Sequence, residues 1–286
     1  MKKILITGAN SYIGMSVGKW LMKEPDKYKV DTVGTIDDTW KNSDFSVYDV
    51  VFHVAGIVHI KESKTNRSLY YKVNRDLAYG IAKKSKIDRV GQFIFLSTMS
   101  VYGIESGTIT KDSPLNPKTA YGQSKLEGEG LINELKDKNF KVAILRPPMV
   151  YGKGCKGNYP RLARLARKTP IFPKIENKRS MIYIDNLSEF IKLLIDNRSA
   201  GLFFPQNKEY VNTSEMVKQI AETHGKKVFF TKIFNPLAKV LNIGIVKKTL
   251  GDLVYEMDMS DHEENYIVCM FKNSIEETES RKETST

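Results

Sequence analysis

The sequence predicts an α/β protein with a doubly wound parallel sheet, followed by a smaller C-terminal lobe. Short apolar runs alternate with stretches of helical pattern along the first 150 residues, which is the rhythm of successive βαβ units. The first apolar run, Ile4–Ile6, passes directly into a glycine turn and a helical pattern. That order is typical of a parallel sheet that begins with a phosphate-binding turn.

Each element follows from its local pattern. The apolar runs are short, as buried parallel strands are, and the predicted strands are 3–7, 29–35, 50–54, 92–97 and 141–146. Helical periodicity predicts helices near 11–23, 68–86, 119–136 and 186–197. The stretch 105–118 contains glycine, asparagine and prolines and is expected to be a loop near the active site. Beyond 152 the alternation ends, and 153–180 reads as a loop with a short basic helix.

Composition narrows the functional class. The chain has 286 residues, enough for one large domain or two modest ones. It contains no apolar run of membrane-spanning length and no signal-peptide pattern, so we expect a soluble, cytoplasmic protein without membrane insertion. Cys155 and Cys269 are too few for a disulfide framework. The four histidines show no metal-ligand spacing, and no metal site is expected.

The net charge of +12 raises the question of nucleic-acid binding. The lysines and arginines are scattered, and no DNA- or RNA-binding motif accompanies them. Arg161, Arg164 and Arg167 do recur at helical spacing; a solvated helix face is favoured there over a rim that attracts an anionic substrate. We interpret the charge as suited to an anionic nucleotide rather than to nucleic acid.

The segment 3–14, KILITGANSYIG, has the composition of a diphosphate cradle. Glycine lets the backbone approach a ligand, and the N-terminus of the following helix directs N–H groups at an anion. Gly8 and Gly14 are the two glycines, and Ser11 stands between them. The alternative is an ordinary strand–helix turn.

The segment 119–125, TAYGQSK, places Tyr121 and Lys125 four residues apart. On a helix both side chains lie on one face. A nearby ammonium stabilises a phenolate, so the pKa of Tyr121 is expected to fall toward the working pH. This pair predicts proton transfer to or from a hydroxyl or carbonyl substrate.

These segments together resemble the extended short-chain dehydrogenase/reductase family, in its NAD-dependent epimerase/dehydratase branch. Further segments match in the same order: 54–56 (VAG), 72–74 (KVN), 96–103 (LSTMSVYG), 146–152 (RPPMVYG) and 179–186 (RSMIYIDN). The resemblance covers roughly residues 1–220 and weakens after 231. The sequence departs from the family's GxxGxxG turn at Ser11, where the middle glycine usually stands.

The resemblance implies a role for each matching position. The expected cofactor-binding residues are Gly8, Asn10, Ser11, Tyr12, Ile13, Gly14, Val54, Ala55, Gly56, Asn74, Tyr121, Lys125 and Pro148. The expected catalytic residues are Thr98, Tyr121 and Lys125. The expected substrate-binding residues are Thr98, Ser100, Tyr121 and Arg179. Arg179 is expected to meet the substrate's diphosphate, since a guanidinium pairs with phosphate oxygens at two points.

The resemblance also implies a domain plan and an assembly. A Rossmann-type NAD(P)-binding domain is expected over 1–150 and about 181–204, a substrate-binding lobe over 151–180 and 205–270, and a frayed tail over 271–286. A homodimer is expected, through the helices 68–86 and 119–136.

The cofactor choice stays open between NAD and NADP. The acid that binds the adenosine ribose of NAD usually ends the second strand, and here Gly34 or Thr35 falls near that position, with Asp37 beyond. No arginine stands nearby for the extra phosphate of NADP, and Lys41 is the closest cation. NAD is slightly favoured.

The resemblance favours a nucleotide-sugar 4-epimerase that acts on a UDP-sugar for surface polysaccharide synthesis. The alternatives are a nucleotide-sugar 4-ketoreductase and a non-catalytic dinucleotide-binding sensor or scaffold. A 4,6-dehydratase is disfavoured, because Met99 and Ser100 occupy the positions of the acidic pair that such enzymes use.

Overall fold

The computed structural model describes residues 1–8, 10–58, 60, 62–232 and 251–280. Its centre is a sheet of six parallel strands in the order β10-β6-β4-β3-β1-β2. The strands are β1 (Lys2–Thr7), β2 (Tyr28–Val33), β3 (Val50–His53), β4 (Gln92–Leu96), β6 (Lys141–Leu145) and β10 (Gly201–Phe203). The predicted α/β class and parallel sheet are confirmed. The edge strand β10 was not predicted.

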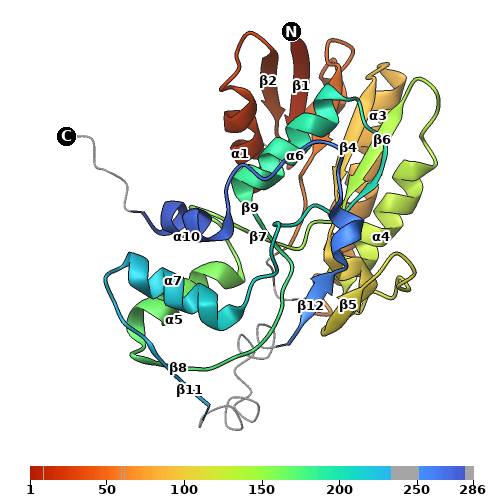
Figure 1. The fold of residues 1–286 in the computed structure, drawn as a ribbon. Helices are drawn as coiled ribbons and strands as arrows, with labels where there is room; N and C mark the ends of the chain where they lie inside the picture. The colour runs from red at the N-terminus through yellow and green to blue at the C-terminus, as the bar shows by residue number, and fades with distance from the viewer. Residues whose placement is uncertain (9, 59, 61, 233–250, 281–286) are drawn as a thin grey trace.

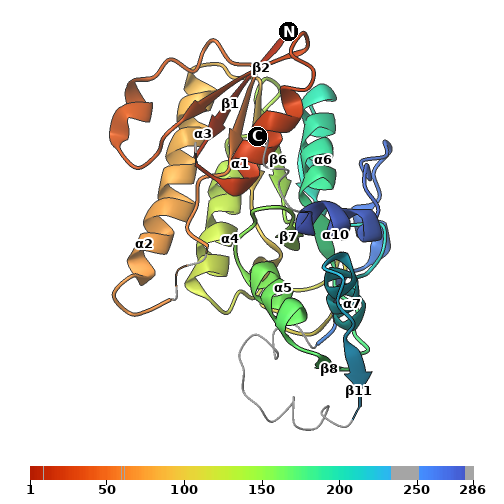
Figure 2. The same ribbon diagram turned by 90° about the vertical axis from the view of Figure 1, so that its left-hand side faces the viewer.

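Helices cover both faces of this sheet, as the doubly wound class requires (Figures 1 and 2). On one face α1 (Tyr12–Leu21) packs against α6 (Ile184–Asp196). The other face carries α3 (Ala78–Ile87) and α4 (Ala120–Asn133), together with α2 (Arg67–Tyr71) and the π-helical turn η2 (Lys72–Leu77). Each face has its own apolar core, which explains why the central strands are apolar on both sides.

The predicted helix 68–86 is continuous but not regular. Its middle turn, η2, is a π-helix, and Asn74 within it is fully buried. A π turn inserts an extra residue into the helical repeat and frequently occurs at functional sites. Helical periodicity in the sequence does not reveal such an insertion.

A lobe lies beyond the carboxyl ends of the strands (Figure 1). It contains α5 (Asn158–Lys168), α7 (Thr213–Thr223) and α10 (Phe271–Glu279), with the strand pair β8 (Ile171–Pro173) and β11 (Phe229–Thr231). A third apolar core joins the three helices. The division of the chain at 150, 181 and 205 into a cofactor domain and a substrate lobe stays a prediction, and residues 233–250 of the predicted lobe lie outside the described residues.

Two short strand pairs connect the lobe to the sheet. β7 (Met149–Tyr151) pairs with β9 (Met181–Tyr183), and β5 (Gly107–Ile109) pairs with β12 (Leu253–Tyr255). The prediction of a loop for 105–118 is therefore wrong at β5. Its partner strand comes from almost 150 residues further along the chain, so local turn residues do not reveal the pairing. The remaining helical turns are η1 (Asp38–Asn42), η3 (Met99–Tyr102) and η4 (Met257–Ser260).

The prediction of a frayed tail from 271 is wrong over Phe271–Glu279, which forms α10. Phe271 and Ile275 are buried in the core of the lobe. The hydroxyls of Tyr151 and Ser274 lie 2.6 Å apart, and the Tyr183 hydroxyl donates to Glu277 at 2.7 Å. Many of the polar side chains of this segment are exposed, although Ser274 and Thr278 are buried. The last six residues of the predicted tail lie outside the described residues.

Candidate functional site

The predicted site residues gather at the carboxyl edge of the sheet. Because β1, β3, β4 and β6 are parallel neighbours, the segments that follow them meet at one edge. These segments contain Gly8, Val54–Gly56, Thr98 and Pro148. Parallel pairing thus brings together motifs that are far apart in the sequence.

The turn after β1 is built for close backbone approach. Gly8 has φ of +85°, in the left-handed region that favours glycine. A Cβ on Gly8 would lie 2.9 Å from the Ala55 Cα, and one on Gly14 would lie 2.9 Å from Val54 Cγ1. The glycines therefore let the β1–α1 turn rest against the segment that follows β3.

Ser11 takes a defined role in this turn. It is the N-cap of α1, and its hydroxyl accepts a hydrogen bond from the Gly14 N–H at 3.3 Å. The N–H groups of Tyr12 and Ile13 have no acceptor within the helix, as in the first turn of any helix. Their orientation and the helix dipole suit a diphosphate. A serine in place of the middle glycine is thus compatible with the cradle.

The side chains of Tyr12 and Ile13 point elsewhere. Both pack against the core of the lobe, and a Cβ on Gly152 would lie 2.7 Å from the Tyr12 hydroxyl. That hydroxyl is buried without a hydrogen-bond partner among the described residues, and burial raises the Tyr12 pKa. The side chain of Tyr12 therefore joins the turn to the lobe, and only its backbone faces the predicted cofactor position. Asn10 is exposed in the turn.

Asn74 fixes the loop that follows β3. Its amide oxygen accepts from the Ile57 N–H at 2.8 Å, and its amide nitrogen donates to the Ile57 carbonyl at 3.1 Å and to the Ser124 hydroxyl at 3.2 Å. A Cβ on Gly56 would lie 3.0 Å from the Asn74 oxygen and 3.3 Å from Lys125 Nζ. Asn74, Gly56 and Lys125 therefore converge, and Asn74 joins the loop to α4.

Helix α4 presents the predicted catalytic pair. Thr119 is its N-cap and accepts from the Gly122 N–H at 3.1 Å, so Tyr121 and Lys125 fall in its first two turns. Lys125 is 3% exposed, and its ammonium donates to the Leu96 carbonyl at 2.8 Å. Burial lowers the pKa of Lys125 to about 8, while the negative charge of Glu129 opposes this effect.

Thr98 lies opposite Tyr121. Its hydroxyl hydrogen-bonds to the Tyr121 phenol and lies 3.2 Å from the Ser100 hydroxyl. Thr98 and Ser100 belong to the tight turn η3, in which the Ser100 N–H donates to Thr98 Oγ at 3.1 Å. The structure thus brings Thr98, Ser100 and Tyr121 together.

The prediction that the pKa of Tyr121 falls toward the working pH is wrong. Burial raises this pKa, and the hydrogen bond from Thr98 is the contact that lowers it. The spacing of Tyr121 and Lys125 correctly predicts a shared helix face, but it carries no information about burial. Burial is the larger effect here.

Arg179 lies apart from these residues, between the lobe and β12. Its backbone bridges Val211 and Leu253, and its guanidinium donates to the Gly251 carbonyl at 2.9 Å. Its Nε is buried without a hydrogen-bond partner among the described residues. Burial lowers the pKa of Arg179, and the negative charge of Asp252 opposes this effect. Its guanidinium forms no ion pair with a carboxylate of the described residues, neither with Asp185 nor with the nearby Asp252.

The sequence did not single out Glu129 and Ser97. The Glu129 carboxylate is buried, forms an ion pair with Arg146 at 2.6 Å and accepts the Ser97 hydroxyl. Glu129 stands four residues after Lys125, which is the helical spacing that places Tyr121 and Lys125 together. Tyr121, Lys125 and Glu129 thus follow one another at intervals of four residues, and this repeated interval is the sequence signal that could have identified Glu129.

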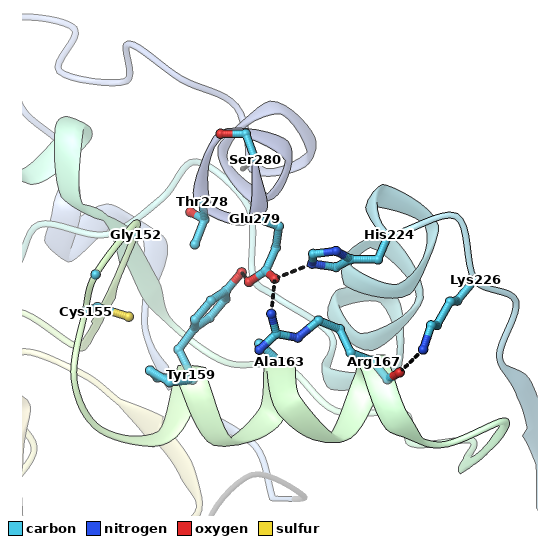
Figure 3. A pocket seen from close by; sticks show the side chains of 12 residues that line it. Gly152, Cys155, Tyr159, Ala163, Arg167, His224, Lys226, Thr278, Glu279 and Ser280 are labelled. Carbon is cyan, nitrogen blue, oxygen red and sulfur yellow. Dashed lines mark hydrogen bonds and ion pairs between the residues drawn. The ribbon is translucent and has the colours of Figure 1, made fainter. Parts of the chain in front are cut away.

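A cavity of about 640 Å³ lies between α5, α7 and α10 (Figure 3). Glu279 makes several polar contacts in this cavity. Its carboxylate accepts a hydrogen bond from the Tyr159 hydroxyl at 3.0 Å, and it lies 2.7 Å from His224 Nε2 and 4.0 Å from Arg167 Nη1. Its lining contains none of the predicted catalytic residues. Arg161 and Arg164 point to solvent on the same helix, as expected for a solvated face.

The described residues offer neither a membrane-spanning helix nor a metal site. No helix in the described part of the chain is both long and apolar enough to cross a membrane. The described residues also contain no cluster of His, Cys, Asp and Glu arranged to hold a metal ion. Cys155 and Cys269 are both free.

Comparison with known proteins agrees with this geometry. The chain is 31% identical to UDP-glucose 4-epimerase of Vibrio cholerae over 77% of this chain and 75% of that protein. UDP-glucuronic acid 4-epimerase from Bacillus cereus in complex with NAD has the same fold, with a TM-score of 0.73, 20% identity and 97% of each chain covered. A dTDP-4-dehydrorhamnose reductase from Clostridium acetobutylicum also has the same fold, with a TM-score of 0.73 and 21% identity. The match covers 96% of this chain and 98% of that protein.

A family description completes the identification. The NAD dependent epimerase/dehydratase family matches residues 4–204, which is well over half of the chain. That range contains the glycine turn, Asn74, Thr98 and the Tyr121–Lys125 pair. The chain therefore belongs to the NAD-dependent epimerase/dehydratase family of enzymes.

Proposed function

We propose that this protein is an NAD(P)-dependent nucleotide-sugar 4-epimerase that acts on a UDP-sugar through a transient 4-keto sugar. The observation that carries the proposal is the arrangement at the end of β4, where Thr98 hydrogen-bonds to the Tyr121 phenol and the Lys125 ammonium donates to the Leu96 carbonyl. The similarity to UDP-glucose 4-epimerase supports the substrate class. A role in surface polysaccharide synthesis is part of the same proposal.

Contacts within the chain support the position proposed for the cofactor. Gly8, Gly14 and the start of α1 would hold the diphosphate, since added Cβ atoms there would collide with the segment after β3. Lys125 and Asn74, which meet at Gly56, would face the nicotinamide ribose. NAD, when bound, supplies the hydride acceptor and donor for the sugar's C4.

Residues of the chain would transfer the proton and orient the substrate. Tyr121 takes the proton from the 4-hydroxyl and returns it to the 4-keto oxygen. Thr98 hydrogen-bonds to the Tyr121 phenol and thereby favours its ionised form, and the Ser100 hydroxyl, 3.2 Å from that of Thr98, would be a further donor for the substrate. Lys125, held by the Leu96 carbonyl, keeps a positive charge beside the cofactor.

A nucleotide-sugar 4-ketoreductase is the second candidate. Burial raises the pKa of Tyr121, which suits a phenol that donates a proton to a ketone. A dTDP-4-dehydrorhamnose reductase shares the fold. Tightly held NAD in freshly purified protein favours the epimerase, whereas an empty protein that accepts NAD(P)H favours the reductase. The absorbance spectrum and extraction of the bound nucleotide distinguish the two.

Substitution of Tyr121 tests the chemistry. Tyr121→Phe keeps the ring and removes the proton-transfer group, so we expect turnover of UDP-sugars to fall by about 10²–10⁴-fold while NADH binding survives. Tyr79→Phe, on α3 outside the site, is the matched control and should keep wild-type turnover. Near-normal turnover of Tyr121→Phe on a substrate that the wild type converts would rule out the mechanism.

A further inference from the structure

A buried ion pair lies directly behind the candidate catalytic residues. Glu129 and Arg146 have side chains that are each 6% exposed. Arg146 Nη2 donates to Glu129 at 2.6 Å, and Arg146 Nε donates to both carboxylate oxygens at 3.1 Å. Arg146 also donates to the Tyr102 hydroxyl at 3.0 Å. The pair thus connects α4 to the end of β6 and to η3.

A pair of this kind needs a reason beyond stability. Removing two charges from water costs about as much as their attraction returns, so apolar residues of similar volume often stabilise a fold at least as well. The contacts of the pair point instead to a geometric role.

The contacts of the pair extend to the two elements that carry the proposed catalytic residues, the end of β4 and α4. Glu129 also accepts a hydrogen bond from the Ser97 hydroxyl, and Ser97 immediately precedes Thr98. The Ser97 N–H donates to the Leu145 carbonyl at 2.7 Å. Glu129 therefore holds the end of β4, which carries Thr98, against the helix that carries Tyr121 and Lys125.

Glu129 also acts on Lys125 through its charge. Two titratable groups interact electrostatically with this ammonium, Glu129 on α4 and His53 on β3. Tyr121 lies one turn before Lys125 on α4, and Arg146 pairs with Glu129 on its other side. Burial raises the pKa of Tyr121 and lowers that of His53 to about 3, so both are neutral near pH 7. The charge of Glu129 favours the charged form of Lys125, as do the Leu96 carbonyl that accepts from the ammonium and the Phe95 ring, whose centroid lies 4.6 Å from it.

We propose that Glu129 is a positioning residue of the site, which holds Thr98 through Ser97 and places a negative charge one helical turn from Lys125, with Arg146 as its counter-charge. The inference rests on the assignment of Lys125 to the cofactor under the proposed function. It assigns no contact with substrate or cofactor to Glu129 itself.

The test measures NADH affinity by fluorescence between about pH 6 and pH 10. In the wild type the affinity falls on the alkaline side as Lys125 loses its proton. Removing the Glu129 charge destabilises the ammonium, so in Glu129→Gln this midpoint should move to lower pH, on the order of one unit. The double variant Glu129→Gln/Arg146→Met should shift in the same direction by less, because the opposing charge of Arg146 is removed as well.

The double variant decides the matter, because Glu129→Gln alone leaves Arg146 buried without a counter-charge and strongly destabilises the fold. Asp88→Asn is the control: it breaks the Lys84–Asp88 pair on α3, also four residues apart and mostly buried, and should keep the wild-type midpoint. A folded double variant with the wild-type midpoint overturns the proposal.

The design separates this inference from the proposed function. NADH binding requires no turnover, so a wild type that binds NADH but converts no nucleotide sugar would refute the function. The midpoint in the double variant would still decide the role of Glu129.

Discussion

At the scale of single residues, the two glycines of α1 differ in what they permit. A Cβ on Gly14 would lie 2.9 Å from Val54 Cγ1 and 3.1 Å from Ile6 Cγ2, whereas one on Gly18 would lie in ordinary contact, 3.6 Å from Ile6 Cδ1. The close approach at Gly14 connects α1 to the segment after β3. It therefore shapes the diphosphate cradle, which Gly18 does not.

This difference gives a matched pair of alanine variants. Gly14→Ala should destabilise the protein by about 1–3 kcal/mol through overpacking, and should lower NADH affinity because the turn must move away from Val54. Gly18→Ala should be neutral or stabilising by up to about 1 kcal/mol, since alanine is the better helix former. Urea denaturation and calorimetric NADH titration check both. Wild-type NADH affinity in Gly14→Ala would show that the turn is not the cradle.

Single residues also show which properties of the site could be predicted from the sequence and which could not. Helical spacing correctly predicted that Tyr121 and Lys125 share one face of a helix, whereas the place of Thr98 was expected from the family resemblance alone. The pKa of Tyr121 could not be predicted, because it depends on burial by residues far away in sequence. The same holds for Ser97 and Glu129, whose hydrogen bond joins two elements that only the folded chain brings together.

At the scale of elements, α10 shows the limit of composition as a guide. Its residues are mostly polar, yet Phe271, Ser274, Ile275 and Thr278 are buried. They recur at the three- and four-residue spacing of one helix face. With only two large apolar side chains, this stripe is too weak to distinguish from a frayed tail. The core strands, by contrast, are apolar on both faces and were predicted within a few residues.

The packing of α10 predicts a contrast between its two faces. Ile275 is fully buried against the core of the lobe, whereas Asn273 is exposed. Ile275→Ala should lower the free energy of unfolding by about 2–4 kcal/mol, because it leaves a cavity. Asn273→Ala should change it by less than about 0.5 kcal/mol. Thermal and urea unfolding measure both; equal stability of the two variants would show that α10 does not pack as described.

At the scale of the whole molecule, the lobe and the sheet are joined at the candidate site. The Tyr255 hydroxyl on β12 donates to the Arg146 carbonyl at the end of β6 at 2.8 Å. The same strand receives the Ser180 N–H, which donates to the Leu253 carbonyl at 3.0 Å. Arg179 therefore belongs to a segment whose position depends on the end of β6. The proposed catalytic and substrate-binding residues are therefore joined through one side chain–backbone contact and one backbone contact.

The last prediction concerns the substrate class and rests on Arg179. Its guanidinium is largely buried, donates to one carbonyl and has no ion pair with a described carboxylate, so a phosphate is a suitable counter-charge. A nucleotide diphosphate is bound equally in ground and transition states. Arg179→Ala should therefore raise KM for a UDP-sugar by about 10–150-fold, or roughly 1.5–3 kcal/mol, with little change in kcat.

Two controls make the result specific to Arg179. Lys178→Ala removes the exposed neighbouring cation and should leave KM unchanged, which separates local pairing from general attraction by the +12 charge. NADH affinity should hardly change in Arg179→Ala, because the cofactor's diphosphate belongs to the β1–α1 turn. A variant that loses NADH affinity but keeps KM, or a wild type that uses free sugars as well as UDP-sugars, would show that Arg179 binds something other than the substrate's diphosphate.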